Sequence, residues 1–423
     1  MDGIEIRPIR EDEFPAILAL VCVAFGEGAT EEDAKAYRAG FPFDRSLCAF
    51  EEGRLVASSG VLSMELTLPG GSVVPMGGVT WIATLPTHRR RGLLRRLMTA
   101  QITDMTARGE ILSGLGASEA NIYGRFGYGP ATHFASFGVE RAFAAFTDPQ
   151  DTGAVGRIRL LGTDEAASQL PPVYESLRLR QPGAVGRTPG MWAEYLGDAP
   201  SAREGAGAMH HCVHETIPGV PDGYVSYRVK NDWKGETPAN EVQVVELQAA
   251  DRHVYRALWG FLLDMDLCQT ITCWRGRVDE PLRWLLADRR RFKVDAVADF
   301  LWLRLLDVPR ALAARTYEVP GELVLEVTDP FPTLRRTCYL LRAESGAEPA
   351  TGPEPHTVAE CTLTTRAPDL TLTMDMLGAV YLGGVSFATL AAAGKLRELT
   401  PGAVKLADRM FSSLPAPYCV VEF

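Results

Sequence analysis

The sequence predicts a multidomain protein of the α/β and α+β classes, in which two tandem α/β domains precede a smaller α+β domain. Its 423 residues exceed what one ordinary hydrophobic core supports, so two or three domains are expected. Helical and strand periodicities alternate as far as about residue 308, whereas short strand-like runs followed by helices fill the remainder. We therefore predict domains at residues 1–140, 141–308 and 309–423.

The first domain is expected to begin with helices and to continue as a sheet. The predicted elements are helices 12–25 and 31–39, strands 47–51 and 54–65 joined by a turn at Glu52-Gly53, strand 79–85, a helix from Gly92 to Gly109, and strand 111–117. The last helix carries its apolar residues at helical spacing, so one face should pack on the sheet.

The other two domains differ in the order of their elements. For the second domain we predict strands 224–229 and 242–247, helix 251–264, and strands 271–274 and 300–305. For the third we predict strands 323–327, 337–343, 360–365 and 370–373, followed by helices 374–382, 387–393 and 401–411. The segment 346–355 is rich in glycine, proline and glutamate, which predicts an exposed turn.

The composition is that of a soluble globular protein. Hydrophobic residues make up 46% of the chain and charged residues 23%. The 53 acidic residues outnumber the 43 basic ones, for a formal net charge of −10, and the basic residues form no long stripe. This charge pattern argues against a nucleic-acid partner.

Targeting signals and metal-binding patterns are missing from the sequence. There is no basic-then-apolar leader pattern and no uninterrupted span of about 20 apolar residues, so we expect a cytoplasmic protein with no membrane partner. The eight cysteines contain no CxxC pair, which predicts reduced, mostly buried thiols. His210, His211 and His214 lie among proline and glycine residues, and we interpret them as a loop cluster. No metal ion is therefore expected.

The junction at residues 79–94 carries the first chemical signal. An apolar strand-like run is followed by Pro86-Thr87-His88, then by Arg89-Arg90-Arg91-Gly92, and then by a helix start. Backbone N–H groups and the positive end of the helix dipole meet at such a junction, which is how proteins hold a pyrophosphate. A solvated charge run is the alternative. The second domain contains no similar turn, so we expect no second cofactor site there.

Two segments resemble motifs of the Gcn5-related N-acetyltransferases (GNAT superfamily). The run from Arg89 to Leu94 resembles their acetyl-CoA pyrophosphate loop, Q/R-x-x-G-x-G/A: Arg89 and Gly92 fit, whereas Leu94 stands where glycine or alanine is usual. The run from Ser118 to Pro130 resembles their Tyr-x-x-x-Gly-aromatic signature. With the tandem α/β halves, the α+β tail and the terminal Glu422-Phe423, the whole chain resembles the enhanced intracellular survival (Eis) acetyltransferases.

This resemblance implies two GNAT-like domains, a sterol-carrier-protein-like third domain, and acetyl-CoA as co-substrate. Backbone groups of Ile82, Ala83 and Thr84 would then contact the pantetheine as an added strand would. The pyrophosphate would be held by the loop and helix start, namely Arg90, Arg91, Gly92, Leu93, Leu94 and Arg95. Ser118 and Glu119 would complete the cofactor contact.

The resemblance also assigns an acid and a base. Tyr123 would be the general acid that protonates the departing thiolate, although a core tyrosine is the simpler interpretation of its sequence context. The base would be the C-terminal carboxylate of Phe423, delivered by the third domain. Last residues ordinarily fray, but residues 418–423 are apolar and strand-like. Glu422 and Trp81 are candidate substrate-binding residues, and Trp81 could equally be a packing residue.

The implied enzyme is an acyltransferase that acetylates primary amines of small polycations, such as aminoglycosides and polyamines, and also peptide lysines. Assembly as a homohexamer is implied by the resemblance alone. Two alternatives stay open: a dedicated protein lysine acetyltransferase, and a lipid- or sterol-binding protein with a vestigial acetyltransferase domain.

Overall fold

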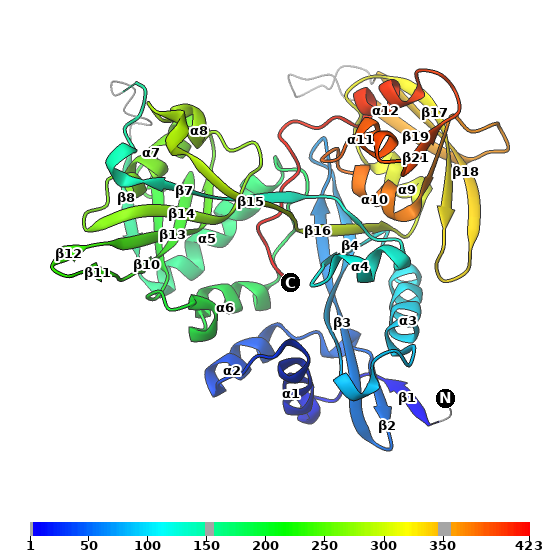
Figure 1. The fold of residues 1–423 in the computed structure, drawn as a ribbon, viewed down its shortest axis with the longest axis horizontal. Coiled ribbons are helices and arrows are strands. Elements are labelled where there is room, and N and C mark those ends of the chain that lie inside the picture. Colours follow the sequence, from blue (N-terminus) through cyan, green and yellow to red (C-terminus); the bar gives the residue numbers. More distant parts are fainter. Residues whose placement is uncertain (1–2, 149–155, 346–356) are drawn as a thin grey trace.

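The computed structural model describes residues 3–148, 156–345 and 357–423. They form three units that correspond to the blue-to-cyan, green, and yellow-to-red parts of Figure 1. The turn predicted at residues 346–355 lies outside the described residues. Within the described ranges, no helix is long and apolar enough to span a lipid bilayer.

The first unit is built on a seven-stranded sheet of order β1-β2-β3-β4-β5-β16-β6. Its strands are β1 (Ile4–Arg7), β2 (Cys48–Glu51), β3 (Arg54–Thr67), β4 (Val73–Thr84), β5 (Leu112–Gly116), β6 (Gly129–Pro130) and β16 (Leu301–Leu305). Its helices are α1 (Phe14–Phe25), α2 (Glu31–Gly40), α3 (Leu93–Ala107) and α4 (Ala120–Tyr123). Helix α3 buries the apolar face expected from its spacing and connects the parallel strands β4 and β5.

The second unit repeats this plan with a second seven-stranded sheet, of order β15-β7-β14-β13-β10-β9-β8. Its strands are β7 (His133–Glu140), β8 (Arg157–Leu161), β9 (His210–Glu215), β10 (Gly223–Lys230), β13 (Asn240–Ala249), β14 (Cys268–Gly276) and β15 (Lys293–Asp299). Its main helices are α5 (Thr163–Arg178), α6 (Pro189–Gly197) and α7 (Arg252–Leu263). Here α7 connects the parallel strands β13 and β14.

The two sheets exchange strands, which the sequence did not predict. We expected the strand at residues 300–305 to belong to the second α/β region, but β16 pairs with β5, from Leu301 opposite Gly116 to Leu305 opposite Leu112. Conversely, β7 lies before residue 140 and yet pairs with β14 and β15 of the second sheet. Apolar periodicity identifies a strand but carries no information about its partner, so this exchange could not be predicted from one sequence.

The third unit is the predicted α+β region. Its five-stranded sheet has the order β19-β18-β17-β20-β21. The strands are β17 (Gly321–Asp329), β18 (Arg335–Ser345), β19 (Thr357–Leu363), β20 (Leu370–Thr373) and β21 (Leu396–Glu398). The helices are α9 (Val308–Ala314), α10 (Met374–Val380), α11 (Phe387–Ala392) and α12 (Ala403–Phe411). Helix α10 packs on β16 and β6 and so attaches this unit to the first sheet.

After α12 the chain turns back toward the other two units. Figure 1 shows this red segment running from the third unit to a C-terminus between α6, α4 and the strands β3 and β4. We predicted a strand-like ending for residues 418–423, but these residues belong to no strand. They are nevertheless packed: Cys419 is 1% exposed and Val421 4%. The backbone N–H of Tyr418 donates to the carbonyl of Pro182 at 2.8 Å. The C-terminal segment is therefore held by tertiary contacts.

Candidate active site

Strands β4 and β5 part in the middle of the first sheet. They are paired from Met76 opposite Leu112 to Gly78 opposite Gly114. Beyond this point β4 continues only beside β3, whereas β5 pairs with β16 on its other edge. The predicted pantetheine-binding residues Ile82, Ala83 and Thr84 lie in this separated half of β4. Their strand edge is available to an extended ligand that carries amide groups.

A bulge marks the start of the separated half. The register between β3 and β4 shifts so that Ser58 faces Ala83 while Gly60 faces Thr80, and Trp81 has a φ of 54°. The hydroxyl of Ser58 donates to the carbonyl of Trp81 at 2.7 Å, which satisfies a backbone acceptor that the bulge displaces. Bulges change the direction of side chains, and here the indole of Trp81 packs into an aromatic cluster.

The N-terminus of α3 lies beside this gap. Gly92 caps the helix with a φ of 76° and supplies no side-chain acceptor, so the first N–H groups stay open to an anion. Arg90 is exposed and also adopts a positive φ, of 63°. Leu93 is buried, and Leu94, the departure from the loop pattern, packs half-buried against the core around Tyr123. The side chain of Leu94 therefore packs the start of α3 against this core.

Two residues predicted to hold the pyrophosphate, Arg91 and Arg95, form hydrogen bonds with other residues of the protein. Arg91 forms a two-point ion pair with Glu51, and His88 Nε2 lies 2.9 Å from the same carboxylate. Hydrogen bonds from Arg91 and then from His88 lower the pKa of Glu51 to about 2. Arg95 donates to the carbonyl of Pro332 at 2.8 Å, in the third unit. An anion at this loop would compete with Glu51 for Arg91.

Tyr123 is buried at the end of α4, with 4% of its surface exposed. Its ring packs edge-to-face against Tyr128, with the ring centroids 6.4 Å apart. Burial, followed by the negative charge of Glu119, raises the pKa of the Tyr123 phenol to about 12, while a hydrogen bond with Ser118 opposes the rise. The phenol is therefore protonated at neutral pH. Ser118 and Glu119 are exposed just beyond β5, so the structure brings all three predicted residues together.

The terminal residue Phe423 reaches the same place. A side-chain carbon placed on Gly78 would lie 3.1 Å from the Phe423 ring, so this glycine is in contact with the ring. Gly78 is also the last residue of β4 that pairs with β5. The ring of the last residue thus lies where the two strands part, although Phe423 stands 345 positions after Gly78 in the sequence.

An aromatic cluster forms around Trp81, and charged side chains lie beside the C-terminus. Trp81 packs against Phe41, Phe14 and Tyr37, with ring centroids 5.0, 6.0 and 6.0 Å away. The side chain of Glu422 is 71% exposed, and one of its oxygens lies 2.6 Å from Nη2 of Arg275. Burial and the charge of Glu422 raise the pKa of Glu194 on α6.

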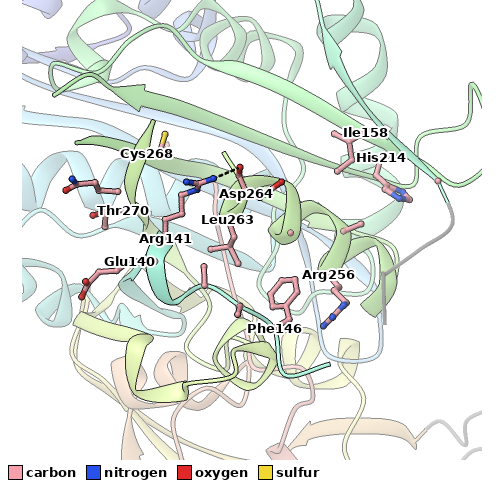
Figure 2. A pocket seen from close by; sticks show the side chains of 17 residues that line it. Glu140, Arg141, Phe146, Ile158, His214, Arg256, Leu263, Asp264, Cys268 and Thr270 are labelled. Atoms are coloured by element: carbon pink, nitrogen blue, oxygen red, sulfur yellow. Dashed lines mark hydrogen bonds between the residues drawn. The ribbon is translucent and has the colours of Figure 1, made fainter. Parts of the chain in front are cut away.

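A separate cavity lies in the second unit. It has a volume of about 1190 Å³ and opens between α7, β14 and the segment that follows β7, as Figure 2 shows. None of the predicted site residues lines it. His214 does line it, and its Nδ1 lies 2.6 Å from Asp222.

The three histidines that we interpreted as a loop cluster instead lie on strand β9, which the sequence analysis had not predicted. Among the described residues, no group of histidine, cysteine, aspartate and glutamate side chains could hold a metal ion.

Known proteins share the domain order and the whole length of this chain. Residues 5–131 and 183–305 each match the acetyltransferase (GNAT) domain family, and residues 308–420 match the sterol carrier protein domain family. The N-acetyltransferase Eis of Mycobacterium tuberculosis is 33% identical over an alignment of 413 residues that covers 95% of each chain. The chain belongs to the Eis family of N-acetyltransferases.

Another relative and a solved structure agree with this assignment. An uncharacterized N-acetyltransferase of Streptomyces avermitilis is 35% identical over 415 residues, covering 98% of both chains. The crystal structure of Eis1 from Mycobacterium abscessus superimposes with a TM-score of 0.83 at 34% identity, covering 99% of this chain and all of that one. The predicted fold class, tandem GNAT domains followed by a sterol-carrier-protein-like domain, is confirmed. This Eis-family protein is an acyltransferase, and its GNAT domains imply the use of acetyl-CoA.

Four residues around the site escaped the sequence analysis. Glu51 lies on β2, Gly78 on β4, Glu194 on α6 and Arg275 on β14. Each interacts with a residue at least 40 positions away in the chain: Glu51 with Arg91, Gly78 with Phe423, and both Glu194 and Arg275 with Glu422. No local pattern marks such residues, and an alignment of relatives is the signal that could have found them.

Proposed function

We propose that this Eis-family enzyme transfers the acetyl group of acetyl-CoA to primary amines of small polycations, such as aminoglycoside-like molecules and polyamines, and to peptide lysines. One observation carries the proposal: the ring of Phe423 contacts Gly78, where β4 and β5 part. A protein that only bound lipid through its third unit would have no need for this contact.

The parted strands and the helix start fit the pantetheine and the pyrophosphate of acetyl-CoA. The pantetheine amides would pair with the strand edge at Ile82, Ala83 and Thr84. The pyrophosphate would lie at the open N-terminus of α3, near Arg90, Arg91, Gly92, Leu93, Leu94 and Arg95. Arg91 would exchange Glu51 for the pyrophosphate. Acetyl-CoA supplies an activated thioester carbonyl.

Two groups of the chain would move the protons. The carboxylate of Phe423, ionised at neutral pH, accepts a proton from the incoming ammonium, directly or through water, and so frees the nitrogen lone pair. The nitrogen bonds to the carbonyl carbon, and the carbon–sulfur bond then breaks. The buried phenol of Tyr123 is protonated and gives its proton to the departing sulfur. The attached nitrogen then loses its surplus proton, which returns through water to the Tyr123 phenolate, and the Phe423 carboxylic acid releases its proton to solvent. The products are an amide and free CoA.

The surroundings of the C-terminus favour a cationic acceptor. Trp81 and its aromatic neighbours would cover the apolar part of the amine. Glu422 and the terminal carboxylate would attract its positive charges. We also propose, on the family resemblance, that the enzyme is cytoplasmic and assembles as a homohexamer.

A thiol-release assay over a panel of amines tests the proposal. CoA release from acetyl-CoA is measured with polyamines, an aminoglycoside and a lysine-containing peptide, and with lipid vesicles as the negative control. We expect release with the small polycations and none with lipid. Release with the peptide alone would favour the dedicated lysine acetyltransferase. No release with any amine would overturn the proposed function.

A further inference from the structure

We propose that Arg275 of the second unit is the positioning residue that holds the C-terminal carboxylate at the transfer site. This inference rests on the proposed role of Phe423 as the base. The guanidinium Nη2 of Arg275 lies 2.6 Å from a carboxylate oxygen of Glu422. Because Glu422 immediately precedes Phe423, an ion pair here restrains the chain one residue before the terminal carboxylate.

The second sheet has a gap like that of the first. Its parallel strands β13 and β14 pair only as far as Val244 opposite Cys273 and then separate. Tyr418 of the C-terminal segment lines the gap together with Val245, Leu247 and Arg275, and only a cavity of about 40 Å³ is left. The gap that corresponds to the acetyl-CoA gap is thus filled by the chain's own C-terminal segment.

Arg275 stands at the edge of this filled gap and contacts the segment twice. Its carbonyl accepts a hydrogen bond from the hydroxyl of Tyr418, and its guanidinium binds Glu422 four residues further on. The register of β14 against β7 shifts between Cys273 and Gly276, so that one extra residue sits next to Arg275. This bulge lets one residue direct both groups toward the C-terminal segment.

The guanidinium is itself held in place. It stacks over the ring of Phe300, 4.7 Å from the ring centroid, and its side chain is only 22% exposed. Its Nε is buried and has no hydrogen-bond partner among the described residues, and Arg275 lines the small cavity together with Glu280 and Trp259. A restrained, partly desolvated cation gives a stronger ion pair than two mobile surface charges.

A purely electrostatic role makes a different prediction. If Arg275 only neutralised Glu422, its removal would strengthen the attraction for cations, and the KM for a polyamine would fall at unchanged kcat. If Arg275 positions the terminus, its removal frees the last residues, and kcat falls for every amine.

The experiment compares Arg275→Gln and Arg275→Lys with Arg283→Gln, an exposed arginine of the same unit for which the described residues offer no hydrogen-bond or ion-pair partner. Kinetics are measured with spermidine and with benzylamine, together with acetyl-CoA affinity. We expect Arg275→Gln to lower kcat about tenfold for both amines at unchanged acetyl-CoA affinity, which also reports correct folding. Arg275→Lys should recover most of the rate, and Arg283→Gln should match the wild type.

A second readout does not depend on transfer activity. Carboxypeptidase A removes C-terminal aromatic residues, and we expect it to release Phe423 about tenfold faster from Arg275→Gln than from the wild type. Unchanged release and unchanged kcat would overturn the inference, as would a fall in spermidine KM alone. If the wild type acetylates no amine, the proposed function fails, while the release rate still decides whether Arg275 holds the C-terminal segment.

Discussion

The two α/β units place a helix in the same position but treat its N-terminus differently. In the first unit α3 connects the parallel strands β4 and β5, and in the second α7 connects β13 and β14. Gly92 leaves the first N–H groups of α3 without a side-chain acceptor. The carboxylate of Asp251 accepts from the N–H groups of His253 and Val254 at 2.7 and 3.0 Å and so closes the start of α7. The residue at the cap therefore sets whether the first N–H groups of the helix are open or already paired.

The gaps between the parallel strands differ as the helix N-termini do: the first is open and the second is occupied. In the first sheet, the edge of β4 that faces β5 pairs with no described strand beyond Gly78. This gap is available to a ligand. In the second sheet Tyr418 lines the corresponding gap. A duplicated fold can therefore keep one ligand site while the other becomes a fixed contact for the chain itself.

The largest expected effect concerns the C-terminus. Deleting Phe423, or adding two glycines after it, should lower kcat by about 10²-fold or more, because the proposed base is lost or displaced. Acetyl-CoA affinity should stay within about twofold of wild type, since the first gap is untouched. Steady-state kinetics and calorimetric titration measure the two quantities. The same glycines added before Met1 are the control, and full turnover by the extended protein would contradict the assignment of the base.

The second-largest effect is expected for Tyr123→Phe, which should lower kcat by about 10²-fold at unchanged acetyl-CoA affinity. Tyr128→Phe is the matched control, because that buried hydroxyl bonds to Ser113 at 2.7 Å and has no proposed role in transfer. With its pKa raised to about 12, the Tyr123 phenol keeps its proton as the pH rises. The wild-type rate should therefore not fall between pH 8 and about pH 10 through loss of this proton. An equal loss in both variants would remove the acid role.

Gly92→Asp would give α3 the kind of cap that α7 has. The new carboxylate should occupy the helix N-terminus and repel the pyrophosphate, so we expect acetyl-CoA affinity to fall about tenfold. Gly92→Asn is the neutral control, because asparagine has the same shape and also tolerates a positive φ. Titration of acetyl-CoA separates the charge effect from backbone strain. Equal affinities of the two variants would mean that the open N-terminus does not bind the anion.

The smallest effect is expected at the N-cap of α7 in the second unit. Asp251→Ala removes the acceptor of the α7 N-terminus and should lower the free energy of unfolding by about 1 kcal/mol, with kcat unchanged. The N–H of Val254 lowers the pKa of Asp251, so the stabilisation is present at neutral pH and is lost as the pH falls through that lowered pKa. Thermal unfolding at pH 7 and at pH 3 checks both points. A large loss of activity would indicate a ligand role for the second unit.

Local patterns indicated the candidate site of the first unit, and long-range packing determined the contacts around it. The loop at Arg89 to Gly92 and the motif around Tyr123 are short segments whose geometry follows from neighbouring residues: the loop ends at the start of α3, as predicted, and Tyr123 lies on α4. The bounds of α3 followed from its apolar spacing and from the glycine at each end.

The contacts that complete the site could not be predicted in this way. The ion pair of Arg91 with Glu51 joins different elements, and so does that of Glu422 with Arg275. Their formation depends on strand order and on the path of the C-terminal segment, for which apolar periodicity gives no signal. The resemblance supplied the role of Phe423, while its contact with Gly78 is visible only in the folded chain.

The exchange of β7 and β16 between the sheets has a consequence for how the protein unfolds. Each sheet contains one strand from the other side of the predicted boundary near residue 140: the first sheet includes β16, and the second includes β7. A fragment ending at residue 140 would lack β16 beside β5 and would carry β7 without its partners. The two α/β units should therefore melt in one cooperative transition, and calorimetry of the intact chain should not resolve them as separate peaks.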